Sequence, residues 1–155
     1  MAIIVPNTAE RELLKLILES QINTGESSAT ADMFINFFKT NLTIDKDTLI
    51  TELIADELTV DQYPVDANDV LKVIDEWSFA TDDDGGVAES DSISITLQNN
   101  DISLEPYKIY GYFITKGISF SDPDRVLMWC EKFPSAFTIP ATGANVTIKL
   151  RLELN

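Results

Sequence analysis

The chain has 155 residues, the length of one ordinary domain, and a core of that size is stable without disulfide bridges. It carries 26 acidic against 11 basic side chains, a net charge of −15, so the phosphates of a nucleic acid and an anionic membrane surface would both repel it. Because the chain has no histidine, it lacks a Ser-His-Asp triad, a Cys-His pair and histidine metal ligands. The single cysteine, Cys130, stands beside Trp129 in an apolar run, which indicates a small buried hydrophobe.

The chain begins with an apolar run, whereas free termini are usually polar and frayed. This run consists of Ala2, Ile3, Ile4 and Val5 and is closed by Pro6. No basic stretch precedes it, so we do not expect a signal peptide, and no run in the chain reaches the ~20 apolar residues of a membrane-spanning helix. We expect residues 1–6 to form an extended arm that docks on the protein's own sheet or on a neighbouring chain. The five residues Ala2, Ile3, Ile4, Val5 and Pro6 are therefore candidate partner-binding residues.

A helix is predicted over residues 7–20. Asn7 is a good N-cap, and Glu10 follows it at the spacing of a capping box. Leu13, Leu14, Ile17 and Leu18 recur at helical spacing and form one apolar stripe. This stripe favours packing on the core or on a sheet.

Most of the remaining chain is typical of short strands separated by polar turns. The predicted elements are, in chain order, a strand over 33–41, a short helix over 48–55 with Asp47 as its cap, a strand over 70–80, an alternating strand over 92–98 and a C-terminal strand over 146–154. The last of these alternates most cleanly, which is typical of a strand with one buried face.

The stretch 108–133 is expected to be the centre of the core. Two apolar runs, 109–114 and 126–130, flank a polar loop, as in a β-hairpin. Neither run alternates with polar residues, so we expect both faces of the hairpin to be covered and Trp129 to be buried. Together these elements predict a mainly β, jelly-roll-like β-sandwich with an N-terminal helix. The organisation is a single domain over 1–155, with the arm at 1–6, the helix at 7–20 and the sandwich at 33–155.

Two acidic turns and a group of aromatic residues are the candidates for chemistry. Asp82, Asp83 and Asp84, followed by Glu89, could hold a hard cation, but they lack the spacing of a calcium loop and favour a solvated hairpin turn. The stretch 122–124, Asp-Pro-Asp, is likewise typical of a turn. Tyr107, Tyr110, Tyr112, Trp129 and Phe133 could stack on a sugar if exposed, although their place in the hairpin favours core packing. The sequence thus predicts no catalytic residue, no cofactor and no resident metal.

The central hairpin resembles a pattern found in small tailed-phage virion proteins. There a YGYF(V/I)T strand is followed by a loop and a (L/M)WAE(R/K)F strand; here residues 110–115 and 128–133 correspond. The opening 4–10, the strand 35–41, the stretch 137–139 and the C-terminal strand are also similar, so the likeness spans most of the chain. Cys130 stands where the pattern has alanine, and the loop 120–124 is longer.

The resemblance implies a non-enzymatic virion component, and the charge favours a place away from the packaged genome. The leading hypothesis is an exterior capsid cement or decoration protein, a homotrimer assembled in the host cytoplasm that clamps the major capsid protein. The alternatives are a tail or baseplate component and, from another class, a carbohydrate-binding module or hydrolase. Nucleic acid and membrane are not expected partners.

Overall fold

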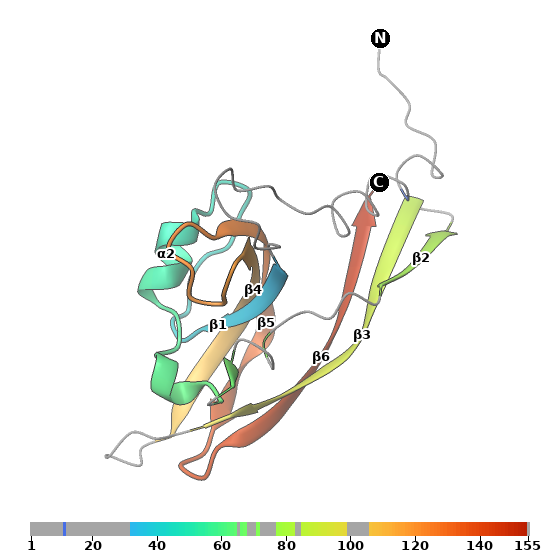
Figure 1. The fold of residues 1–155 in the computed structure, drawn as a ribbon. Coiled ribbons are helices and arrows are strands. Elements are labelled where there is room, and N and C mark those ends of the chain that lie inside the picture. Colours follow the sequence, from blue (N-terminus) through green and yellow to red (C-terminus); the bar gives the residue numbers. More distant parts are fainter. Residues whose placement is uncertain are drawn as a thin grey trace. The chain divides into compact units, whose positions relative to one another are not determined.

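The computed structural model describes residues 11, 32–64, 66–67, 71, 77–82, 85–98 and 106–154 (Figure 1). In this part of the chain the fold is mainly β, with two three-stranded antiparallel sheets and little helix. The arm at 1–6 lies outside the described residues, and so does the helix predicted over 7–20 apart from Arg11, whose backbone is helical. No helix within the described ranges is long and apolar enough to cross a bilayer.

The chain divides into two compact units. One comprises residues 1–22, 74–93 and 147–155, and the other comprises residues 23–73 and 94–146. The single-domain organisation over 1–155 stays a prediction.

The larger unit contains a sheet with the strand order β1-β4-β5. Its strands are β1 (Asp32–Phe38), β4 (Tyr107–Gly117) and β5 (Val126–Ile139), and both pairings are antiparallel. This confirms the predicted strand near 33–41, which ends at Phe38, and the predicted central hairpin.

The centre of this sheet is β4, because it has a neighbouring strand on each side. Consecutive residues of β4 are buried, including Phe113 and Ile114 on opposite faces, so both faces are covered. Strand β5 is mostly exposed or half-buried, and Trp129 is half-buried. The prediction that both faces are covered is therefore right for β4 and wrong for β5.

A short helix covers one face of this sheet. Helix α2 (Ile50–Ala55) buries Leu53 against Phe38 and Phe113, which confirms the predicted helix near 48–55. The N–H of Leu49 donates to the Glu52 carboxylate at 3.0 Å, so the cap comes from within the helix and not from Asp47. The single turn η1 (Val60–Gln62) follows.

The second sheet has the strand order β2-β3-β6. Its strands are β2 (Trp77–Asp82), β3 (Gly85–Leu97) and β6 (Ala144–Leu154). Alternation is clear in both long strands: Ile93, Ile95 and Leu97 are buried in β3, and Val146, Ile148 and Leu150 are buried in β6. The strands predicted over 92–98 and 146–154 are confirmed. The strand predicted over 70–80 begins only at Trp77 in the described residues, and Leu71 lies in a bend.

Candidate interaction surface

The chain itself closes one edge of the β1-β4-β5 sheet. The N–H of Phe37 in β1 donates to the Tyr63 hydroxyl at 2.9 Å, and the Phe37 carbonyl accepts from the N–H of Leu58 at 3.0 Å. The N–H of Ile35 donates to the Leu71 carbonyl at 2.9 Å. Backbone groups that already have such partners cannot pair with another strand. The β1 edge is therefore blocked.

The opposite edge of the sheet is β5, which has β4 on one side and no strand beyond it in the described part of the chain. This edge strand is long, at 14 residues. Pro134 fits an edge position because proline has no N–H for a strand ladder. It also divides the strand, so the stretch 126–133 is the longer segment without proline. We call residues 126–133 the β5 edge.

Apolar side chains line this strand. Val126 is 51% exposed and Phe137, beyond Pro134, is 52% exposed. The half-buried apolar residues of the β5 edge are Leu127, Met128, Trp129, Cys130 and Phe133. The pairing with β4 is irregular beside Met128, between Ile114 and Thr115 of β4. An open strand edge with apolar groups on it is a typical site for another chain to pair.

A buried ion pair fixes the start of the β5 edge. The Arg125 guanidinium donates to the Glu57 carboxylate and to the Phe120 carbonyl. The two charged side chains are only 4% and 11% exposed. The guanidinium carbon also lies 5.9 Å from the centre of the Phe113 ring. Arg125 therefore ties the loop before β5 both to the core and to a residue that pairs with the end of β1.

The groups around this ion pair have shifted acidities. Burial raises the pKa of the Glu57 carboxyl, although Arg125 and the Tyr63 hydroxyl act in the opposite direction. Burial also raises the pKa of Tyr63 well above its ordinary value, and the nearby Glu57 charge adds to that shift. The rings of Tyr63 and Phe120 pack edge to face, with their centres 5.4 Å apart. These groups are packed against one another, which indicates a structural role.

The loop between β4 and β5 is held by Asp122. Its carboxylate accepts from the N–H of Ile118 and from the N–H of Asp124, each at 2.9 Å. The predicted turn at 122–124 is confirmed, and its acidic side chain stabilises the backbone. Ile118, at the start of the loop, is 57% exposed.

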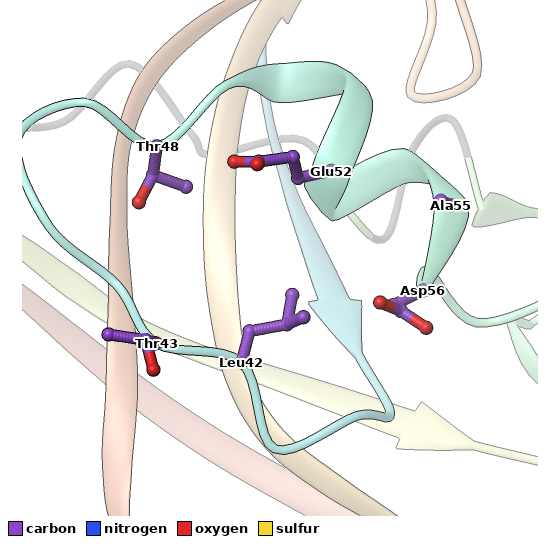
Figure 2. A pocket seen from close by; sticks show the side chains of 6 residues that line it. All are labelled: Leu42, Thr43, Thr48, Glu52, Ala55 and Asp56. Carbon is purple, nitrogen blue, oxygen red and sulfur yellow. The ribbon is translucent and has the colours of Figure 1, made fainter.

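A shallow hollow of about 420 Å³ lies beside α2 (Figure 2). It is lined by Leu42, Thr43, Thr48, Glu52, Ala55 and Asp56. Both of its carboxylates serve the local fold, because Glu52 caps α2 and Asp56 accepts from the Thr40 hydroxyl at 2.6 Å. On the nearby sheet face, the Lys132 ammonium donates to the Leu42 carbonyl at 2.9 Å and pins this segment to β5.

The acidic turn considered as a cation site, and interpreted as a solvated turn, is only partly described. Asp82 pairs with Gly85 where β2 meets β3, whereas Asp83 and Asp84 lie outside the described residues. Glu89 is engaged elsewhere in the same unit, in ion pairs with Lys149 at 2.8 Å and Arg151 at 3.0 Å. Within the ranges that the structure describes, no three acidic or cysteine side chains are grouped so as to hold a metal ion.

The aromatic residues considered for sugar stacking do not form one exposed platform. Tyr112 is buried and its hydroxyl donates to Glu131 at 2.5 Å, while the Tyr107 hydroxyl donates to the Gln98 carbonyl at 2.8 Å. Tyr110, Trp129 and Phe133 are half-buried. Cys130 packs at the margin of the Phe113 cluster, and burial raises the pKa of its thiol.

The predicted partner-binding residues, Ala2 to Pro6, lie outside the described residues, so their role stays a prediction. Sequence reasoning missed the β5 edge and the Arg125–Glu57 pair. Pro134 was the one available signal for the edge, because proline within a strand favours an edge position. The pair had no such signal.

No family model, no curated protein and no solved structure matches this chain.

Proposed function

We propose that the protein is a non-enzymatic structural protein of a tailed-phage virion, acting as a cement or decoration protein on the capsid exterior. In this role it stabilises the shell by clamping neighbouring copies of the major capsid protein, and it works as a homotrimer. The resemblance of residues 110–115 and 128–133 to small phage virion proteins supports the virion assignment. The net charge of −15 favours a position away from packaged DNA.

One structural observation supports the assembly role: the chain itself closes the β1 edge of the sheet, whereas no strand among the described residues lies beyond β5. In the described part of this sheet, backbone groups of β1 already have partners and β5 has no second neighbouring strand, so an added strand would pair at β5 and not at β1. The exposed Val126 side chain and the half-buried Trp129 would supply apolar area to such a contact.

The finer fold that accompanies this proposal is a jelly-roll-like β-sandwich with an N-terminal helix over 7–20. The sandwich is supported by the apolar face that each sheet buries, with the paired residues Ile35 and Ile114 in one and Ile93 and Ile148 in the other. Two sheets with such faces are stabilised by packing on each other.

A tail or baseplate position is the alternative within the virion, since an open strand edge serves either assembly. Copy number separates the two. Quantitative mass spectrometry of purified virions is expected to give hundreds of copies for a capsid protein, whereas a few to some dozens would assign the protein to the tail. Particles without the protein are expected to lose heat or low-salt stability and to regain it when purified protein is added back. Virions that lack the protein altogether would overturn the proposal.

A further inference from the structure

We propose that the β5 edge receives the N-terminal arm, residues 2–5, of a second copy of this chain as an added strand. The inference rests on the proposed assembly function and deepens it, because it names the partner of the open edge. The two halves of the contact are the backbone of residues 126–133 and a short apolar segment that precedes Pro6.

The arm has the composition of an added strand. Ile3, Ile4 and Val5 are β-branched residues, which favour extended backbone, and Pro6 would end the pairing because it offers no N–H. The arm carries no charged side chain, and the first acidic residue of the chain is Glu10. Strand addition gives affinity through the backbone and specificity through alternate side chains, and a short apolar segment supplies both.

The edge offers a matching receptor. Residues 126–133 exceed the length of the arm, and residues 129–132 among them pair with β4 without a register shift, so a four-residue arm can pair within this stretch. Val126 is 51% exposed at one end of this stretch and Trp129 is half-buried within it, so an added strand would cover apolar surface. The buried pair of Arg125 and Glu57 holds the start of the edge in place, which lowers the entropy cost of docking.

Charge favours an arm over a face-to-face contact between two copies. Each copy carries a net charge of −15, so two acidic bodies pressed together would repel. Residues 7–31 connect the arm to β1, and a segment of 25 residues spans at most roughly 80 Å. This length is several times the screening length of about 8 Å at physiological salt. Two copies joined by an arm can therefore stay far enough apart for their charges to be screened from each other. An uncharged arm therefore joins copies without bringing their acidic surfaces together.

The test uses the full chain and a matched pair of variants on one strand. Val126→Lys places a charge on the β5 edge, and Phe137→Lys makes the same charge change at a position of equal exposure beyond Pro134. Sedimentation over a range of protein concentrations measures self-association of the wild type, of both variants and of a chain that lacks residues 1–6. We expect the wild type to associate, and Val126→Lys and the truncation each to weaken association roughly tenfold or more, an effect of about 1.4 kcal/mol. Phe137→Lys is expected to associate as the wild type does.

A wild type that stays monomeric at every concentration overturns the proposal. If this monomer binds virions and Val126→Lys abolishes that binding, the partner of the β5 edge is another virion protein and not a second copy. Equal effects of the two lysine variants also overturn it. Should the truncated chain fail to fold by circular dichroism, the arm belongs to its own chain's core and the proposal is wrong. Virion binding is measured separately, so a protein that exchanges arms but does not bind virions contradicts the proposed function and leaves the arm contact standing.

Discussion

The carboxylate of Glu57 and the guanidinium of Arg125 meet in the interior although 68 residues separate them in the chain. Glu57 forms an isolated bridge to the end of β1, and Arg125 immediately precedes β5, so the pair joins the blocked side of the sheet to the open one. Its side chains have little contact with water, at 4% and 11% exposure. Ion pairs at such depth stabilise a fold only while both partners are present.

The first prediction concerns this pair. Arg125→Met leaves the Glu57 carboxylate buried without its counter-ion, and Glu57→Leu leaves a guanidinium that cannot lose its proton; each change should cost about 3–5 kcal/mol of unfolding free energy. The double variant should cost far less than the sum, because neither charge remains. Urea denaturation of the four proteins gives the coupling energy. Additive costs would contradict the direct interaction.

The second prediction concerns pH, and it sets Glu57 against Glu89. Burial raises the pKa of Glu57 in the folded protein above its ordinary value of 4.5. Between 4.5 and the raised pKa, the folded protein therefore binds more protons than the unfolded chain, and the stability that Glu57 contributes falls as pH rises through this range. Hydrogen bonds from Lys149 and then Arg151 lower the pKa of Glu89. Its contribution is therefore present above 4.5 and is lost as pH falls through the lowered pKa.

Urea denaturation between pH 3 and 8 tests both pH dependences. At each pH, the unfolding free energy of Glu57→Gln or of Glu89→Gln is subtracted from that of the wild type. The wild-type advantage should decline with rising pH for Glu57 and grow with rising pH for Glu89. Salt should reduce the second effect more than the first, because Lys149 and Arg151 are about half exposed. Slopes of the same sign would show that one of the two environments is wrongly assigned.

The third prediction concerns Gly111, which lies in β4 where β5 and the ring of Phe38 approach closely. A Cβ at this position would overlap the Glu131 carbonyl and the Phe38 ring. Because a backbone carbonyl cannot move without shifting β5, Gly111→Ala should cost about 1–3 kcal/mol. Thermal unfolding measures the loss, with the exposed Ser135→Ala in β5 as the control. A fully stable Gly111→Ala would mean that the two strands are further apart at this point.

Local patterns explain which parts of the fold were predictable. The alternation of Ile93, Ile95 and Leu97 identified a half-buried strand, and the same rule identified β6. The β5 edge was misjudged because residues 126–130 have the composition of a core strand, whereas the order of strands in the sheet decides their exposure. No local sequence pattern predicts the order of strands, and none predicts that Glu57 contacts Arg125, 68 residues further along the chain. The arm at 2–5 stays a prediction from composition.

The fourth prediction compares two aromatic side chains from the predicted hairpin. Phe113 in β4 is fully buried against Phe38 and Leu53, so Phe113→Ala should cost about 3–5 kcal/mol, as removal of a core ring does. Trp129 in β5 is half-buried, so Trp129→Ala removes less buried area and should cost roughly half as much.

Chemical denaturation at low protein concentration measures both costs in the free chain. If the arm of a second copy covers β5 when copies associate, Trp129→Ala should also weaken that association. The stability of this variant should then fall less on dilution than the stability of the wild type. Equal costs for the two variants in the dilute chain would contradict the exposure of β5 and show that this strand lies inside a core, as the sequence pattern alone predicts.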